Sequence, residues 1–149
     1  MCPALTPSSE RLRLVEIAHS WLGTPWHHEA RIKGAGVDCL QLLIAVYVEA
    51  GLIDDIHPDP YASDWHLHRD EPRYLEGLLG YCDPVDDPLP GDIVMFKYGR
   101  QAAHGAIVID WPTIIHAWRD QRAVVLSDVA NTPTLSERVA GFYRLKGLS

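Results

Sequence analysis

Three cysteines are candidates for nucleophilic chemistry, because a thiol becomes a strong nucleophile where its surroundings favour the thiolate. Cys39 lies where a helix is predicted to begin, and the unpaired amides and dipole of a helix N-terminus favour negative charge. Cys2 lies in a terminal segment expected to fray, and Cys82 lies in a predicted loop with nearby acids that disfavour a thiolate. We therefore take Cys39 as the candidate nucleophile and the other two as non-catalytic. Burial as a small apolar residue, the common fate of a lone cysteine, remains open for Cys39.

Two histidines, His104 and His116, could supply the base that such a thiol needs. They are twelve residues apart in two predicted strands, and an even separation can place both side chains on one face of a sheet. An odd-numbered hairpin loop centred on Asp110 would put them opposite each other, with Cβ atoms about 5 Å apart, and one centred on Trp111 would make them diagonal neighbours at ~7–8 Å. An even-numbered loop would separate them onto opposite faces.

If the histidines pair, His104 can accept the proton of Cys39 while His116 holds the His104 ring in the right tautomer. The alternative is that both are half-buried strand residues with local hydrogen bonds.

Predicted helices occupy the first half of the chain. Ser8 or Ser9 can cap a helix with apolar residues at helical spacing, which ends at Gly23-Thr24-Pro25. A second helix is predicted to begin near Asp38 and to end before Gly51. Its apolar side carries Cys39, Leu42, Leu43, Val46 and Ala50. We expect an ordered loop over residues 52–70 and a short helix around residues 74–79.

From Pro90-Gly91 onward the hydrophobic period changes to two, which is typical of strands. Strands are predicted near residues 92–98, 103–109, 113–118, 122–126 and 139–145. A length of 149 residues suits one domain, so we expect a single α+β domain over residues 1–149, with a helix packed across a curved antiparallel sheet.

Composition excludes several classes of function. A net charge of −7 argues against a protein that binds nucleic acid or an anionic membrane. The longest apolar runs, such as residues 42–46, are far shorter than the ~18 residues of a membrane span. An odd number of cysteines and no signal-peptide pattern argue against a disulfide framework. His27-His28 and His66-Leu67-His68 lack the spacing of known zinc motifs, so we expect no metal or other cofactor.

Five short motifs, in order along the chain, resemble those of the NlpC-like cell-wall cysteine peptidases, a papain-like family that cleaves peptidoglycan stem peptides. They are Gly23-Thr24-Pro25-Trp26, Asp38-Cys39 followed by Leu42, Leu89-Pro90-Gly91-Asp92-Ile93-Val94, His104-Gly105-Ala106-Ile107-Val108 and Ile115-His116-Ala117. The resemblance implies a papain-like fold, with N-terminal helices on a curved antiparallel sheet of about five or six strands. Within the family, Trp26-His27-His28 and the longer run before Asp38 look most similar to peptidases of phage tails and gene transfer agents.

By this resemblance Cys39 would be the nucleophile, His104 the base and His116 the third member of a triad. The reaction would be amide hydrolysis through a thioester, at the bond between the γ-carboxyl group of D-glutamate and diaminopimelate. The backbone N–H of Cys39 would meet the oxyanion. Substrate binding is expected at Trp26, His27, Asp38, Gln41 and Trp118.

The sequence departs from the family at two of these places. Trp26 stands where the family commonly has a tyrosine whose hydroxyl lies near the oxyanion site, and tryptophan offers only an indole N–H. Leu40 and Gln41 replace the small residues that usually follow the cysteine. The stem-peptide preference therefore stays open.

The resemblance also implies a setting. We expect a protein made without a signal peptide, assembled with hub or baseplate proteins of a phage-type tail, and acting on the cell wall in the periplasm. One alternative is a tail plug or adaptor that keeps the fold with little or no activity. Another is a related amidase or acyltransferase with the same chemistry. The peptidase interpretation requires Cys39, His104 and His116 to meet at a point that solvent can reach.

Overall fold

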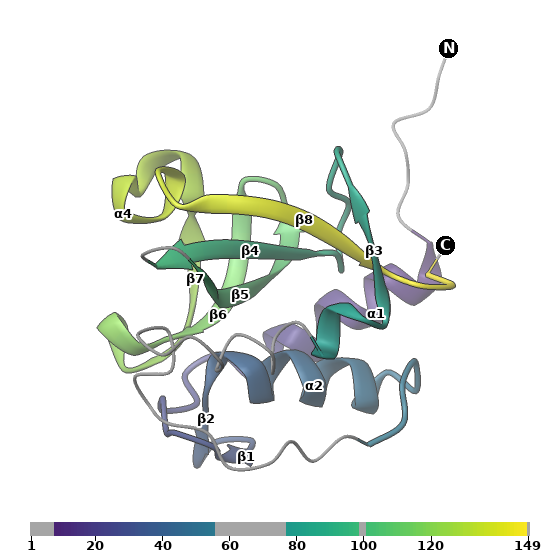
Figure 1. Cartoon of the computed structure of the whole chain (residues 1–149). Coiled ribbons are helices and arrows are strands. Elements are labelled where there is room, and N and C mark those ends of the chain that lie inside the picture. Colours follow the sequence, from purple (N-terminus) through teal and green to yellow (C-terminus); the bar gives the residue numbers. More distant parts are fainter. Residues whose placement is uncertain (1–7, 56–76, 99–100, 149) are drawn as a thin grey trace.

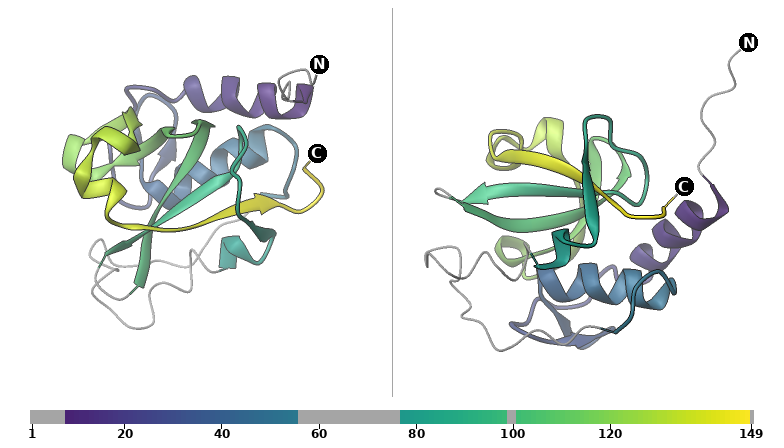
Figure 2. Two further views of the ribbon diagram at one scale, coloured as in Figure 1. Left: turned by 90° about the horizontal axis from the view of Figure 1, so that it is seen from above. Right: turned by 45° about the vertical axis from the view of Figure 1, so that its right-hand side comes forward.

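One antiparallel sheet carries the site and most of the core. The computed structural model describes residues 8–55, 77–98 and 101–148 (Figure 1). In spatial order the sheet consists of β3 (Cys82–Val85), β8 (Val139–Leu145), β4 (Ile93–Tyr98), β5 (Gln101–Asp110), β6 (Thr113–Trp118) and β7 (Ala123–Asp128). The helices α1 (Ser9–His19) and α2 (Cys39–Glu49) lie on one side of it (Figure 2). The α+β class predicted from the sequence is confirmed.

Shorter elements connect these. A two-stranded sheet of β1 (Arg31–Ile32) and β2 (Gly36–Val37) precedes α2. The turns η2 (Arg119–Gln121) and η3 (Val129–Asn131) and the short helix α4 (Pro133–Ser136) lie between the last strands. Residues 77–79 are helical, as expected. The rest of that predicted helix, and residues 56–70 of the predicted loop with His66 and His68, lie outside the described residues, as does Cys2.

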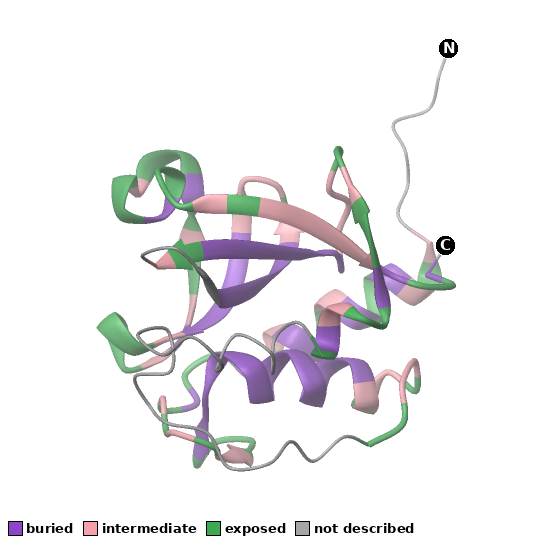
Figure 3. Cartoon of the chain, in the orientation of Figure 1, coloured by how far each residue is buried: buried purple, intermediate pink, exposed green. Residues whose placement is uncertain are grey.

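Both long helices begin at the predicted caps. The Ser8 side chain accepts a hydrogen bond from the backbone N–H of Arg11, and Asp38 accepts one from Gln41. The helix α1 ends at His19, one turn before the predicted end. The prediction that α2 is apolar on one side only was too narrow, because every residue from Cys39 to Tyr47 is buried (Figure 3). This helix contacts α1, β1, β5 and β6, and so its whole surface is covered over most of its length.

The strands β6 and β8 have their predicted bounds. The strand β4 differs from prediction by one residue at its start, and β5 and β7 differ by one or two residues at each end. The loop predicted around Cys82 is wrong, because Cys82 begins β3 and pairs with Leu145 of β8. A four-residue segment with an aspartate and a proline has no strand pattern of its own, and β8 supplies the pairing.

The sheet has an apolar core on each face. Ile93, Ile107, Ile115 and their neighbours at alternate positions pack with α1 and α2. On the other face, Phe96 and Ile114 belong to a second cluster. Val94, Ala106, Val108, Val129 and Leu135 complete it. Because alternate residues of a strand face opposite sides, His104 and His116 share one face of their two strands, and the His104 ring lies 5.7 Å from that of Phe96.

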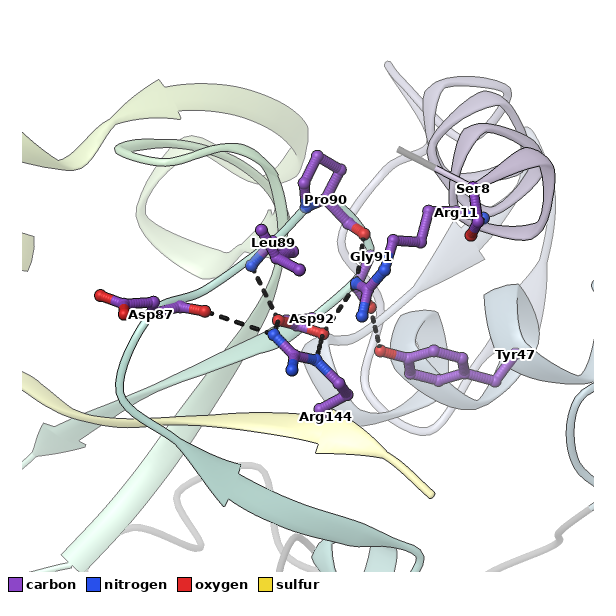
Figure 4. A network of polar contacts seen from close by, with 9 residues as sticks. All are labelled: Ser8, Arg11, Tyr47, Asp87, Leu89, Pro90, Gly91, Asp92 and Arg144. Atoms are coloured by element: carbon purple, nitrogen blue, oxygen red, sulfur yellow. Dashed lines mark hydrogen bonds and ion pairs between the residues drawn. The ribbon is translucent and has the colours of Figure 1, made fainter. Parts of the chain in front are cut away.

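The Pro-Gly-Asp motif forms a buried ion network at the start of β4 (Figure 4). Asp92 is fully buried and accepts hydrogen bonds from Arg11 of α1 at 3.0 Å and from Arg144 of β8 at 2.9 and 3.1 Å. The backbone N–H of Leu89 also donates to Asp92, and the Tyr47 hydroxyl of α2 donates to the Gly91 carbonyl at 2.6 Å. One turn therefore ties both helices and β8 to the sheet.

Within the described residues, none of the helices combines the length and the apolar character needed to span a membrane.

Candidate active site

The hairpin of β5 and β6 determines how the two histidines meet. Its turn contains two residues, Trp111 and Pro112, because Asp110 pairs with Thr113. An even-numbered loop was expected to separate the histidines, but the register shifts between Val108 and Asp110. This β-bulge adds one residue to β5 and cancels the effect of the even loop.

Beyond the bulge Val108 pairs with Ile114 and Ile107 with Ile115, a register centred on Trp111. Its continuation makes His104 and His116 diagonal neighbours on one face, which is one of the two arrangements expected.

The imidazoles are hydrogen-bonded to each other. His104 Nε2 lies 2.7 Å from His116 Nδ1, and the ring centroids are 5.0 Å apart. The other nitrogen of His116, Nε2, lies 2.9 Å from the Ser127 hydroxyl oxygen on β7. Three adjacent strands thus contribute a continuous row of polar side chains. The bond to His116 occupies Nε2 of His104, and so Nδ1 is the nitrogen with which His104 can exchange a proton with a nucleophile.

Both rings are buried among aromatic side chains. Phe96 and Tyr98 of β4 lie 5.7 and 6.2 Å from the His104 ring, and Trp118 stacks on the His116 ring at 5.0 Å. Burial lowers the pKa of His104 to about 4, and burial together with His104 lowers the pKa of His116 well below its usual value. At pH 7 both imidazoles are therefore neutral.

The candidate nucleophile, Cys39, is the first residue of α2. It is 8% exposed, and burial and then the charge of Asp38 raise the pKa of its thiol to about 12. The backbone N–H groups of Gly105, Leu40 and Cys39 itself lower this pKa, as expected at a helix start, but burial outweighs them. The burial that the sequence left open for Cys39 is therefore what the structure has, and the raised pKa favours the protonated thiol at neutral pH.

The thiol lies against β5 beside the histidine pair. It interacts with the backbone N–H of Gly105, the residue that follows His104. In the part of the chain that the structure describes, no hydrogen bond joins the Cys39 sulfur to His104. The helix start and the histidine pair are brought together through adjacent residues, because Gly105 directly follows His104.

Asp38 has a defined structural role. One carboxylate oxygen accepts from the backbone N–H of Gln41 at 2.9 Å and the other from Glu29 at 2.8 Å. Glu29 has φ +62°, so the carboxylate holds a strained turn as well as capping α2. Asp38 is only 4% exposed, and its place in substrate binding stays a prediction.

The other residues expected to bind substrate lie near the start of α2 or beside the histidine pair. Trp26 is half-buried, and the Arg119 guanidinium lies 5.4 Å from the centre of its ring. His27 is exposed, Gln41 is buried in the first turn of α2, and Trp118 is half-buried against His116. Trp26 reaches this position because residues 23–26 run along the edge of β7, with Gly23 and Trp26 donating to Val124 and Arg122.

No family model matches the sequence, and no curated protein matches it either. Solved structures do match. One is an NlpC/P60 family protein from Bacillus cereus, with a TM-score of 0.67 and 23% identity over 97% of this chain. The NlpC/p60 domain of the peptidoglycan hydrolase SagA gives a TM-score of 0.60 at 18% identity over 89% of this chain and 96% of that chain. An N-acetylmuramoyl-L-alanine amidase from Bacteroides uniformis gives 0.60 at 14% identity over 93% of this chain and 100% of that chain.

The chain has the NlpC/P60 fold. It spans 42% of the Bacillus cereus protein, less than half of its length. The fold implied by the sequence motifs is confirmed, and the roles of individual residues stay proposals.

Two residues of this candidate site were missed from the sequence. Ser127 fell one residue beyond the predicted strand 122–126, whereas β7 continues to Asp128. Gly105 was noted only as part of a motif. It has no side chain to cover its backbone, and its position directly after His104 is the only signal that could have identified it.

Proposed function

We propose that the protein is a cysteine peptidase that hydrolyses peptidoglycan stem peptides, with Cys39 as nucleophile, His104 as base and His116 as the residue that orients the base. The observation that carries this proposal is the 2.7 Å bond between the histidines, on the strand against which the first residue of α2 lies. The NlpC/P60 fold supports the substrate class, because SagA is named a peptidoglycan hydrolase.

In the proposed reaction the sulfur of Cys39 attacks an amide carbonyl carbon while its proton moves to His104 Nδ1. The tetrahedral oxyanion accepts a hydrogen bond from the backbone N–H of Cys39. Collapse of this intermediate breaks the C–N bond, the amine leaves with the proton from His104, and a thioester remains. Water then attacks the thioester with His104 as base and regenerates the thiol.

The pKa shifts favour a neutral thiol beside a neutral imidazole, so the proton moves during the attack rather than before it. The thiol must turn from Gly105 towards His104, and the buried site must open for a substrate to enter. The scissile bond that we propose is the one between the γ-carboxyl group of D-glutamate and diaminopimelate. Tail hub or baseplate proteins remain our proposed partners, and the cell wall the proposed place of action.

The test is release of diaminopimelate-containing fragments from purified sacculi, followed by mass spectrometry of the products. We expect release by the wild-type protein and none by Cys39→Ala or His104→Ala. Equal release by wild type and Cys39→Ala would end the peptidase proposal. A new N-terminus on diaminopimelate identifies the proposed bond, whereas a free N-terminal L-alanine with an intact stem identifies an amidase.

The burial of Cys39 and its raised pKa favour a second candidate, a structural plug or adaptor that keeps the fold without activity. Alkylation by iodoacetamide separates the two. Labelling of Cys39 below pH 8 that falls in His104→Ala supports the peptidase. A thiol that stays unlabelled, together with intact sacculi, supports the adaptor.

A further inference from the structure

Ser127 is the last member of the polar row that begins at His104. It lies on β7 opposite Ile114, two residues from His116 along β6, and so it is on the same face of the sheet as His116. Its hydroxyl oxygen lies 2.9 Å from His116 Nε2. His116 is fully buried, and each of its two ring nitrogens thus has one polar partner.

The direction of these hydrogen bonds matters for the proposed reaction, on which this inference rests. A neutral imidazole carries a proton on one nitrogen and accepts at the other. For His104 to take a proton at Nδ1, its Nε2 must carry a proton and donate to His116 Nδ1. His116 must then carry its own proton on Nε2, where the available acceptor is the oxygen of Ser127.

We propose that Ser127 is a fourth, positioning residue, whose hydroxyl accepts the Nε2–H of His116 and so keeps His116 Nδ1 as the acceptor for His104. Without the hydroxyl, that N–H would be buried without a partner, which is unfavourable. The opposite tautomer of His116 would then be preferred. It would present an N–H to His104 Nε2 and leave the proton of His104 on Nδ1, where the base must be empty.

A hydroxyl can also donate to an unprotonated Nε2 of His116, but His104 would then carry its proton on Nδ1 and could not act as the base. Proton uptake by His104 requires the proposed arrangement, because both nitrogens of the imidazolium carry protons and Nε2 then needs an acceptor. The contribution of Ser127 is therefore largest when His104 is charged, at the moment of nucleophilic attack. Ser127 acts on the base through His116, and the inference assigns it no contact with substrate.

The experiment compares Ser127→Thr with Ser127→Val, two side chains of similar shape of which only threonine keeps a hydroxyl. Nitrogen-15 NMR of histidine-labelled protein reports the tautomer of each ring and needs no activity. We expect His116 to carry its proton on Nε2 in wild type and Ser127→Thr, and to shift towards Nδ1 in Ser127→Val. A wild-type His116 protonated on Nδ1, or one whose tautomer is the same in all three proteins, overturns the inference.

Kinetics on muropeptides gives the second readout. We expect kcat to fall about fivefold to tenfold in Ser127→Val, with KM within about twofold and near-complete recovery in Ser127→Thr. Ser136→Ala, an exposed serine of α4, should leave both constants unchanged. If wild type proves inactive, the proposed function fails while the NMR result still decides the role of Ser127. Equal kcat in the threonine and valine variants of an active enzyme overturns the inference.

Discussion

Replacing Asp92 with alanine tests whether the buried ion network holds the helices to the sheet. Asp92 and Arg11 are 0% and 2% exposed, with their charged atoms 3.0 Å apart. Removal of the carboxylate leaves the Arg11 guanidinium buried without its counter-charge, at a cost of about 3–5 kcal/mol. The N–H of Leu89 loses its acceptor, which adds about 1–3 kcal/mol. Arg144, which is 27% exposed, adds little because water screens it.

We therefore expect Asp92→Ala to lower the free energy of unfolding by about 4–8 kcal/mol, a large part of the stability of a domain this size. The assay is urea denaturation at pH 7 followed by tryptophan fluorescence. Arg144→Gln is the control and should cost under about 1 kcal/mol. The double variant Arg11→Met/Asp92→Leu removes both buried charges and should recover much of the loss. A single variant within about 1 kcal/mol of wild type, or a double variant no more stable than the single one, would refute the reasoning.

Three further predictions concern the site and its supports. Burial lowers the pKa of His104 to about 4, so between about pH 6.5 and pH 4 the unfolded chain binds more protons than the folded protein. The free energy of unfolding therefore falls as the pH falls through that range, by at most about 1.4 kcal/mol per pH unit. Urea titrations at several pH values should show a weaker dependence in His104→Phe, and an unchanged slope contradicts the assignment. Asp38→Asn keeps one oxygen to cap α2, gives up the bond from the Glu29 N–H, and removes a charge that raises the pKa of Cys39. Alkylation of Cys39 at pH 8 should therefore be severalfold faster than in wild type, and an equal or slower rate would show that the charge has no such effect. Gly36→Ala would place a Cβ 2.8 Å from the His27 Cβ and should lower the free energy of unfolding by about 1–3 kcal/mol in urea, and a neutral result would mean that this contact relaxes freely.

Local patterns predicted the parts of the fold that depend on neighbouring residues in the chain. The caps Ser8 and Asp38 were readable because a cap needs only a short polar side chain before an apolar run. The limits of β6 and β8 were readable from their alternation. The strand β3 was not, because its stability comes from β8, some 60 residues further along the chain. The partners of Asp92 were missed for the same reason, since Arg11 and Arg144 come from opposite ends of the sequence.

In the site, too, local patterns predicted some features and missed those that depend on distant parts of the chain. The even spacing of His104 and His116 allowed them to pair only if the hairpin loop had an odd number of residues. The loop has two residues, and the histidines still share a face because a bulge at the end of β5 shifts the register by one residue. No residue type around Ile109 marks that bulge. Ser127 was missed because strand ends are the least reliable part of a pattern. The burial that sets the pKa values of Cys39 and His104 is a property of the whole packed structure, and no local pattern contains it.

The first turn of α2 combines two electrostatic effects that oppose each other at one thiol. The amides of the turn favour a thiolate, whereas the carboxylate that caps the same turn disfavours it, and burial then decides in favour of the neutral form. A site of this kind cannot store a thiolate and an imidazolium at rest. In the proposed reaction, its reactivity must come from stabilising the imidazolium that forms during attack. The groups that can do so are on the sheet rather than on the helix, because His104 is hydrogen-bonded to His116 and His116 to Ser127. The proposed catalysis should therefore depend on the register of three strands more than on the helix dipole.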